Sequence, residues 1–424
     1  MARKMKDSGI EWIGEIPEGW EIKYFVQLFS QVKNKNIGLR EKNLLSLSYG
    51  KIKQKSIETV GGLLPDNFEG YNIIDRNDIV LRLTDLQNDQ HSLRVGLSPE
   101  RGIITSAYCS IRVRGAESPN YLYYYLHTFD IAKGFYGMGS GVRQGLNWDG
   151  LKYIKILLPP QHEQDRISVF LNQKTLEIDS MLSKTISSIE EYKKLKQAVI
   201  TQAVTKGVRG EREMKDSGVE WIGEIPKEWI CEKIKYATSI SRGLFNHRPR
   251  NDERYYNGKY PFIQTGDVAN ATKYIVSYSQ TLNELGKAVS KEFPKGTLTM
   301  TIAANVGDVA ILNFDAYFPD SVVCFIPNKN IRTLYLFYVF SSMKDEFTRT
   351  AIKSTQLNLN IDRVKETFIP VTLSVNEQCE IENYLESKCA EIDGLIAKKE
   401  QLVKELESYK KSLIYEVVTG KREV

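Results

Sequence analysis

The sequence predicts an α+β protein in which two pseudo-symmetric globular domains are joined by two long helices that form an intramolecular antiparallel coiled coil. Three observations predict this fold. A sixteen-residue stretch occurs twice, two long segments of helical pattern follow in the same order, and short strand-like runs fill the regions between them. The strand-like runs are separated by Gly, Asn and Asp, which are typical of turns.

The repeated stretch reads MKDSGIEWIGEIPEGW at residues 5–20 and MKDSGVEWIGEIPKEW at residues 214–229. Thirteen of its sixteen positions are identical, at an offset of 209 residues. A second similarity, at an offset of 214, relates residues 163–205 to residues 377–419. These periods are far longer than those of solenoid repeats. They indicate duplication of a whole unit, in which a motif is followed by a globular region and then by a helix.

The duplication also predicts the domain boundaries. A chain of 424 residues is long enough for two or three domains. We expect an N-terminal repeat motif (1–20), a first globular domain (21–158), a central helix (159–208), the second motif with its globular domain (209–372) and a C-terminal helix (373–424).

Both predicted helices carry a heptad pattern. Residues 161–206 contain neither Gly nor Pro, and residues 375–419 contain only Gly394. An exposed apolar seam needs a partner, and we expect the other helix of the same chain; the alternative is a coiled coil between two chains. Apolar residues recur at alternating steps of four and three, as in a coiled-coil seam, at Ile178, Leu182, Ile189, Tyr192 and Val199 and at Ile392, Ile396, Val403, Leu406 and Leu413.

Capping signals mark the ends of these helices. Pro159 and Pro160 end a strand-like run, and a helix can start directly after them. Ser374 followed by Glu377 has the spacing of a capping box. Gly207 and Gly420 stand where C-terminal caps belong.

Aromatic residues in the globular regions are interpreted as core. The run Tyr121, Tyr123, Tyr124, Tyr125 and Phe129 has helical spacing, which favours packing over base stacking. The motif tryptophans are expected to anchor each domain against the helix ends, and they are Trp12, Trp20, Trp221 and Trp229. The clearest strand candidates are residues 78–83, 107–113, 297–302 and 322–326.

Motif searches find no catalytic constellation. The phosphate-binding GxxxxGK[ST] loop, the GxSxG elbow and the GxGxxG turn are all absent from the sequence. Five scattered cysteines and four histidines lack the spacing of a zinc site. No signal peptide or long apolar run occurs. We therefore expect no catalytic residues, no metal and no cofactor bound by this chain, and a cytoplasmic location.

Polar and basic loops remain as candidates for DNA contacts, and the net charge of +5 permits such a partner without requiring it. Arg and Gln can read guanine and adenine edges, while Lys, Ser and Thr commonly contact phosphates. Any one of these residues could equally be a solvated surface group. The candidates are Arg82, Thr84, Arg94, Arg143 and Gln144 in the first half and Arg242, His247, Arg248, Arg250, Lys353, Ser354, Thr355 and Gln356 in the second.

The combination of features resembles the specificity subunit of type I restriction–modification enzymes. The resemblance covers essentially the whole chain. It rests on W-I-G-E-I-P-x-x-W at Trp12–Trp20 and at Trp221–Trp229, and on P-x-x-E-Q at Pro160–Gln164. In the second copy Ser374 replaces the proline.

This resemblance implies that each globular domain is a target recognition domain for one half of an asymmetric, bipartite DNA site. The two helices would set the spacing between the half-sites. Modification (methyltransferase) subunits, which use S-adenosylmethionine to methylate adenine, would dock on the helices, and restriction subunits would add translocation and cleavage driven by ATP and Mg. The expected partners are double-stranded DNA and these subunits, and no membrane.

Two other function classes compete with this interpretation. A coiled-coil adaptor that does not bind DNA would fit the polar loops and the mild charge equally well. A self-sufficient nuclease or methyltransferase is disfavoured by the missing motifs.

Overall fold

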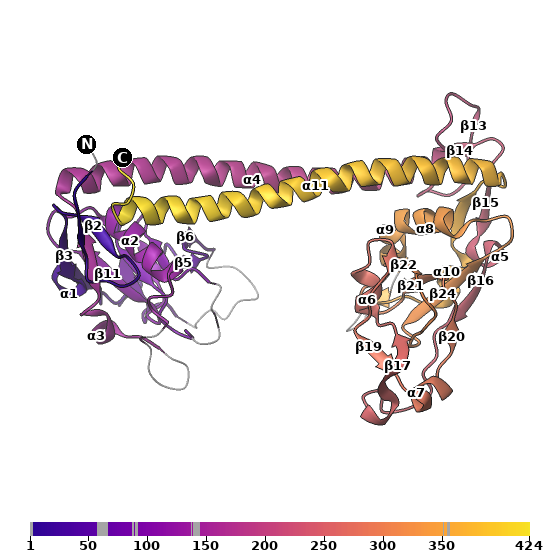
Figure 1. The fold of residues 1–424 in the computed structure, drawn as a ribbon, viewed down its shortest axis with the longest axis horizontal. Coiled ribbons are helices and arrows are strands. Elements are labelled where there is room, and N and C mark those ends of the chain that lie inside the picture. Colours follow the sequence, from indigo (N-terminus) through magenta and orange to yellow (C-terminus); the bar gives the residue numbers. More distant parts are fainter. Residues whose placement is uncertain are drawn as a thin grey trace. The chain divides into compact units, whose positions relative to one another are not determined.

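The computed structural model describes residues 3–56, 67–86, 89, 92–136, 138, 145–350, 352–353 and 357–424, with the backbone alone at 350, 352–353 and 357–358. Contacts divide the chain into two compact units (Figure 1). Unit 1 comprises residues 1–186 and 401–424, and unit 2 comprises residues 187–400. Each long helix therefore contributes one half to each unit.

Unit 1 is built from short strands around one aromatic helix. Its largest sheet has the antiparallel order β4-β11-β8-β9. The pairs β1–β2, β3–β12, β5–β6 and β7–β10 complete it. The elements are β1 Met5–Asp7, β2 Glu15–Pro17, β3 Glu21–Tyr24, α1 Phe25–Leu28, β4 Phe29–Gln31, β5 Leu45–Ser48, β6 Lys51–Gln54, β7 Asn72–Ile74, β8 Ile79–Leu81, β9 Val95–Leu97, β10 Gly102–Ile104, β11 Cys109–Val113, α2 Pro119–Ile131, α3 Trp148–Leu151, β12 Lys155–Leu158 and the first part of α4 Gln161–Lys206.

Unit 2 repeats this plan with larger sheets, in the orders β16-β24-β21-β22-β18 and β19-β17-β23-β20. The pairs β13–β14, β15–β27 and β25–β26 are also present. The elements are β13 Met214–Asp216, β14 Glu224–Pro226, β15 Ile230–Lys233, α5 Ile234–Ala237, β16 Thr238–Arg242, the 3-10 helix η1 Glu253–Tyr255, β17 Tyr256–Phe262, α6 Thr265–Ala269, β18 Tyr274–Ile275, β19 Gln280–Leu282, α7 Glu284–Ala288, β20 Glu292–Phe293, β21 Leu298–Thr301, β22 Val309–Leu312, β23 Ala316–Tyr317, β24 Val322–Pro327, α8 Thr333–Ser342, α9 Lys344–Thr350, β25 Ile352–Lys353, β26 Leu357–Asn358, α10 Ile361–Glu366, β27 Phe368–Val371 and the first part of α11 Val375–Val418.

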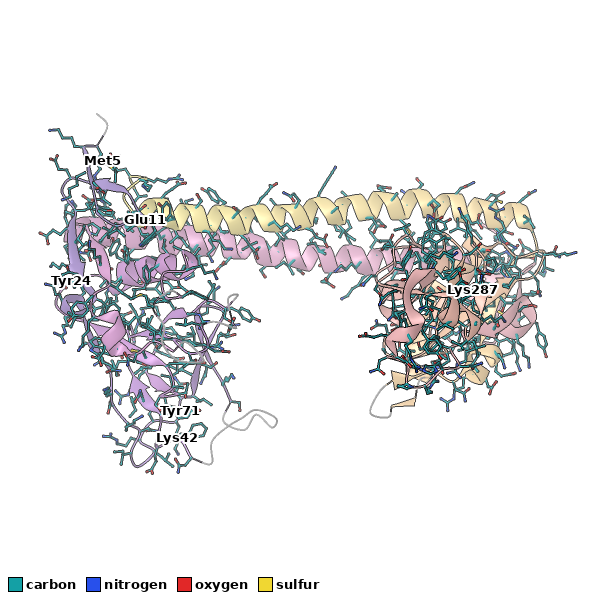
Figure 2. The ribbon with its side chains drawn as sticks, turned by 60° about the horizontal axis from the view of Figure 1, so that its bottom comes forward. Met5, Glu11, Tyr24, Lys42, Tyr71 and Lys287 are labelled. Carbon is teal, nitrogen blue, oxygen red and sulfur yellow. The ribbon has the colours of Figure 1, made fainter. Side chains whose placement is uncertain are left out.

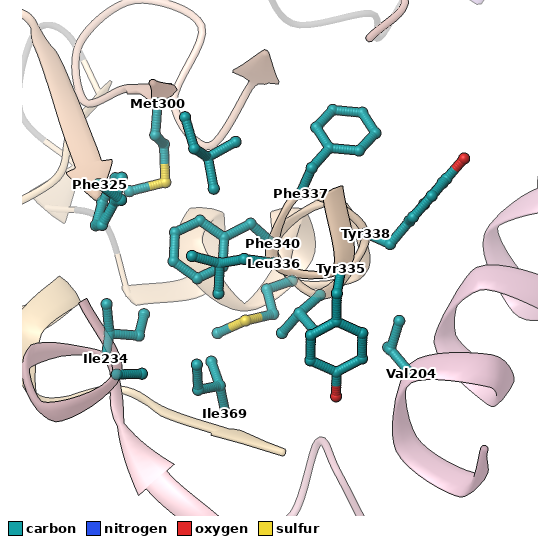
Figure 3. Close-up of a cluster of buried hydrophobic side chains, with 14 of the residues drawn as sticks. Val204, Ile234, Met300, Phe325, Tyr335, Leu336, Phe337, Tyr338, Phe340 and Ile369 are labelled. Atoms are coloured by element: carbon teal, nitrogen blue, oxygen red, sulfur yellow. The ribbon is translucent and has the colours of Figure 1, made fainter. Parts of the chain in front are cut away.

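The predicted elements are present. Three strand candidates contain β8, β11 and β21, the fourth coincides with β24 except for its last residue, Pro327, and the helices α4 and α11 are 46 and 44 residues long. The aromatic run forms α2, in which Tyr121 and Tyr125 are fully buried. Its counterpart α8 lies in the core of unit 2. There, side chains of α8 meet Val204 of α4, Ile234 of α5 and Ile369 of β27 (Figure 3).

Within each unit, segments of α4 and α11 pack antiparallel along the predicted seam. In unit 1, Lys410 donates to Asp179 at 2.5 Å. In unit 2, Lys196 donates to Asp393 at 2.7 Å. The lysines occupy seam positions and interrupt the apolar pattern there. All ten predicted seam residues are buried or half-buried, namely Ile178, Leu182, Ile189, Tyr192, Val199, Ile392, Ile396, Val403, Leu406 and Leu413.

A partly buried Trp–Glu hydrogen bond joins the first motif to the start of α4. Trp20, which is 1% exposed, donates its indole N–H to Glu163 at 3.0 Å. Arg3 donates to the other carboxylate oxygen at 2.6 Å and lies over the Trp20 ring. Burial raises the pKa of Glu163, but the hydrogen bonds from Arg3 and Trp20 outweigh burial and leave this pKa below its usual value.

The second copy reproduces this junction at the start of α11. Trp229 donates to Glu377 at 3.1 Å, and Arg212 occupies the place of Arg3. The predicted capping box is therefore only half formed. The Ser374 hydroxyl accepts from the Glu377 N–H at 3.3 Å, as predicted. The Glu377 carboxylate turns instead to Trp229, Arg212 and Thr372.

Each junction also receives the end of the other helix. Gly420, after α11, has a φ of +73°, and a Cβ there would lie 2.4 Å from Pro17. Gly207, after α4, has a φ of +76°, and a Cβ there would lie 3.4 Å from Trp229. Both positions thus require glycine for its backbone conformation, as their predicted role as C-terminal caps implies.

We predict that Trp20→Phe lowers the free energy of unfolding of unit 1 by about 2 kcal/mol, because a half-buried carboxylate loses a charged hydrogen bond. Denaturant unfolding measures this change. The control is Trp12→Phe, which makes the same replacement at the half-buried tryptophan of the same motif. Equal losses in the two variants would attribute the effect to side-chain volume and contradict the hydrogen-bond explanation.

A second prediction concerns His127, which is 8% exposed and whose pKa is lowered to about 4, first by burial and then by Lys410 and Lys411. The unfolded pKa is about 6.5, so the folded protein binds fewer protons between these values, and stability falls as pH falls from 6.5 to 4. Between pH 7 and 5 this linkage costs about 2 kcal/mol.

Glutamine does not titrate, so His127→Gln removes this contribution. Burial raises the pKa of Asp130 to about 6, so its contribution to stability changes with pH in the opposite direction. That contribution is the same in the unaltered chain and in His127→Gln. The free energy of unfolding at pH 7 and 5 is compared in the two proteins. An identical loss in His127→Gln would show that His127 is not responsible.

Candidate nucleic-acid interface

The first candidate surface is the loop that follows β8 in unit 1. Thr84 is exposed there, and Arg82 is half-buried, 3.4 Å from Asp89. The hydroxyl and backbone N–H of Ser92 lower the pKa of Asp89 to about 2, so this carboxylate is charged and Arg82 is partly neutralised. Arg82 and Thr84 therefore lie where a ligand can reach them.

Arg94 does not belong to the accessible set. It is 0% exposed, and its guanidinium donates to carbonyls of the same loop and to Tyr136. A buried guanidinium with no free N–H cannot contact a base, so the prediction that Arg94 binds DNA is wrong. The isolated sequence could not show this because burial is decided by tertiary packing.

A second loop of unit 1 meets the first. Leu146 donates its backbone N–H to the Leu83 carbonyl at 2.9 Å. This bond brings the chain that follows Arg143 and Gln144 beside the loop of Arg82. Arg143 and Gln144 themselves lie outside the described residues.

The hairpin β5–β6 is a basic feature that the sequence reasoning missed. Its tip carries Tyr49, which is 80% exposed, and Lys51, Lys53 and Lys55 follow. Lys53 and Lys55 are exposed, whereas Lys51 donates to Asp179 at 2.7 Å. The alternating pattern KIKQK, with Ile52 buried, was the available signal, because alternate strand residues share one face.

The hairpin lies beside the Arg82 loop. A Cβ on Gly50 would be 3.0 Å from the Leu93 side chain, next to Arg94 in the chain. Lysine ammonium groups are suited to phosphates, and an exposed tyrosine ring can stack on a base. Unit 1 thus combines a lysine hairpin and a polar loop in one region.

Arginines form the corresponding surface of unit 2. Arg250 and Arg248 lie beside the carboxylate of Asp320, with Arg248 at 3.7 Å, and Arg242 donates to the Asp320 carbonyl. Arg248 and Arg250 have side chains that are 55% and 46% exposed. Two guanidinium groups share the Asp320 carboxylate and a third is bound to the Asp320 backbone carbonyl, so the cluster keeps excess positive charge and accessible donors. The structure thus brings three predicted residues together.

His247 lies next to this cluster with a defined set of contacts. Its ring stacks on Tyr255 at 4.0 Å, and Nε2 is 3.0 Å from Asp252. The hydrogen bond from Arg254 is the main cause that lowers the pKa of Asp252. The remaining predicted residues of unit 2 follow α9: Lys353 lies in β25 with its side chain outside the described set, and Ser354, Thr355 and Gln356 lie outside the described residues.

Equivalent loops in the two units have equivalent backbones. Leu359 donates its N–H to the Ile302 carbonyl at 2.8 Å, as Leu146 does to Leu83. Two residues further on, Asp85 and Ala304 have φ values of +58° and +62°. The frame of the candidate surface is therefore duplicated, while its side chains differ.

Across the part of the chain that the structure describes, no group of three or more His, Cys, Asp or Glu residues is arranged to hold a metal ion. Among those same residues, no helix combines the length and apolarity that crossing a bilayer requires.

Comparison with known proteins agrees with the fold. The family model described as the type I restriction modification DNA specificity domain matches residues 243–405. A protein of Methanocaldococcus jannaschii, provisionally named the type I restriction enzyme MjaX specificity subunit, is 25% identical over 96% of this chain and 95% of its own length. The MjaVIII specificity subunit from the same organism is 24% identical over 96% and 93%.

Solved structures share the fold. One, from work on the assembly and conformational transition of the type I R-M system, has a TM-score of 0.73 at 15% identity and covers 96% of this chain and 99% of its own. The HsdS subunit from Thermoanaerobacter tengcongensis has a TM-score of 0.51 at 15% identity, with 96% and 98% covered.

These matches define the class as DNA-recognition proteins of restriction–modification systems. The two units and their paired long helices are the features of this chain that fit the class. Within this class, the chain belongs to the specificity subunits of type I restriction–modification enzymes.

We predict that Lys53→Ala and Lys55→Ala in the assembled complex weaken binding to all DNA sequences alike. Each change should reduce the slope of log affinity against log salt by about 1, because one phosphate contact is lost. Salt titration of DNA binding measures this slope. Lys6→Ala is the control, because Lys6 is exposed and lies in β1, which pairs with β2 of the motif and not with the hairpin; Met5 of β1 and Lys42, shortly before β5, lie at opposite ends of unit 1 (Figure 2). An unchanged slope in both hairpin variants would exclude the hairpin from the interface.

Proposed function

We propose that this chain selects the site of a type I complex by reading two different DNA half-sites, one with each globular domain. The observation that supports this proposal is that the two units share the same backbone contacts around the candidate loops but present different side chains on them. The frames share the Trp–Glu junctions and the loop bonds of Leu146 and Leu359. The surfaces differ, because unit 1 presents a lysine hairpin and unit 2 an arginine cluster.

Unequal surfaces favour an asymmetric target. Lysines without a fixed geometry suit phosphate contacts, whereas arginine forks suit guanine edges. Two readers of different chemistry on one chain would recognise different short sequences. The helix pair would then set the spacing between the half-sites, since a helix rises about 1.5 Å per residue.

Chemistry in this proposal belongs to partner subunits, and the chain is a non-catalytic component. Modification subunits would bring S-adenosylmethionine and methylate adenine, and restriction subunits would bring ATP- and Mg-dependent steps. The complex would act in the cytoplasm, where DNA is accessible.

Paired cavities support docking of two copies of one partner. A cavity of about 440 Å³ in unit 1 is lined by Tyr124 of α2, by Asp179 and by Lys410. A cavity of about 330 Å³ in unit 2 is lined by Tyr338 of α8, by Asp393 and by Lys196. The offset of 214 residues relates Tyr124 to Tyr338, Asp179 to Asp393 and Lys196 to Lys410.

The test is to map methylated adenines by single-molecule sequencing of DNA from cells that express this chain with its modification partner. We expect one bipartite motif with a fixed gap, absent when this chain is omitted. Exchange of unit 2's globular region for that of another specificity subunit should replace one half of the motif only. Methylation that does not depend on the chain, or a motif without a gap, would contradict the proposal.

A further inference from the structure

The guanidinium of Arg94 is fully buried beneath the Arg82 loop, and all five of its N–H groups are used. Nη1 donates to the carbonyls of Arg82 at 3.1 Å and Thr84 at 2.9 Å. Nη2 donates to the carbonyls of Asp85 and Asp89, and Nε donates to the Tyr136 hydroxyl at 3.1 Å. An Arg side chain has five such donors, so none remains free.

The loop needs this support because its own backbone satisfies only part of it. Four of its carbonyls converge on Arg94; that of Asp85 also accepts the Asp89 N–H at 3.2 Å and that of Asp89 also accepts the Tyr136 hydroxyl at 3.4 Å, whereas the carbonyls of Arg82 and Thr84 depend on the guanidinium. Asp85 also has a φ of +58°, which a residue with a side chain rarely adopts. Arg94 thus replaces the hydrogen bonds that a regular strand or turn would have supplied.

Neighbouring groups balance and orient the buried charge. Hydrogen bonds from Ser92 lower the pKa of Asp89, and the Arg94 charge adds to this effect. Burial raises the pKa of Asp130 to about 6, and the contacts with Arg94 oppose that rise. Asp130 accepts the backbone N–H of Arg94 at 2.7 Å, and the Tyr136 ring lies 5.0 Å from the guanidinium carbon. Asp130 of α2 therefore holds the backbone of Arg94, and Tyr136, in the segment after α2, holds its side chain.

Unit 2 stabilises its equivalent loop differently. There the Thr301 hydroxyl donates to the Asn305 carbonyl, the Gly307 N–H donates to Thr301, and Lys344 pairs with Asp308. The buried arginine therefore belongs to unit 1 alone and is not one of the backbone features that the two units share.

We propose that Arg94 is a positioning residue for half-site reading: it holds the loop so that Arg82 and Thr84 face DNA in one conformation. The inference rests on the proposed function. It predicts that Arg94 affects discrimination at one half-site and leaves the other unchanged, which a general loss of stability would not do.

The experiment measures methylation of correct sites and of sites with one mismatch, by the complete complex, for each half-site separately. Arg94→Lys keeps the buried charge but offers three donors in place of five. We expect about a tenfold loss of discrimination at one half-site, the size of one lost bidentate contact, and less than a twofold change at the other. Arg82→Ala should relax the same half-site.

Arg112→Lys is the matched control. Arg112 is also held by hydrogen bonds in unit 1, to Asp75 and Asp78, but it supports a different turn. Its replacement should leave both half-sites within twofold of the unaltered chain. Hydrogen exchange adds a direct readout, because the amide of Arg82, which donates to the Arg94 carbonyl, should exchange faster in Arg94→Lys while β8 and β11 stay protected.

The outcomes separate the two proposals. If the unaltered chain directs no bipartite methylation, the proposed function fails. If it does, and Arg94→Lys discriminates as well as the unaltered chain, or relaxes both half-sites equally, the positioning role is wrong. An insoluble Arg94→Lys complex would also overturn it, because the residue would then be required for folding and not for reading alone.

Discussion

The hydrogen bond from a motif tryptophan to a glutamate in the first turn of a long helix is the interaction on which the structure depends. Trp20 with Glu163 and Trp229 with Glu377 are the two copies. A carboxylate at this position also faces the positive end of the helix dipole. The glycine that caps the other helix packs against the same motif. One small cluster therefore contains the start of a globular domain, the start of one long helix and the end of the other.

This constraint explains why the motif is duplicated while the domains diverge. The junction contacts use a Trp, an Arg and a Glu whose geometry must be kept in each copy. The sheets beyond it are free to differ, with a largest sheet of four strands in unit 1 and five in unit 2. A specificity subunit needs this division, because recognition of a new DNA sequence requires new surfaces on an unchanged frame.

Polar residues in the helix seam add a second constraint. Lys196 and Lys410 look like defects in the heptad pattern, yet each pairs with an aspartate of the facing helix. Isolated exposed pairs contribute little stability, but polar residues within a seam can specify register. In this register both lysines are paired, and Lys51 of the hairpin joins the same aspartate as Lys410.

From the sequence alone, the long helices, their seams, their caps and the packing role of the tryptophans were predictable, since heptad spacing and capping are local patterns. Membership of the family was predictable for the same reason, because its motifs are contiguous. Whether a single loop residue is exposed or buried was decided only by the tertiary structure. Arg82 and Arg94 are both arginines beside a strand, but one reaches the surface and the other is buried under carbonyls contributed by a loop whose course no local pattern encodes. The convergence of Arg242, Arg248 and Arg250 on Asp320 likewise joins residues about seventy positions apart.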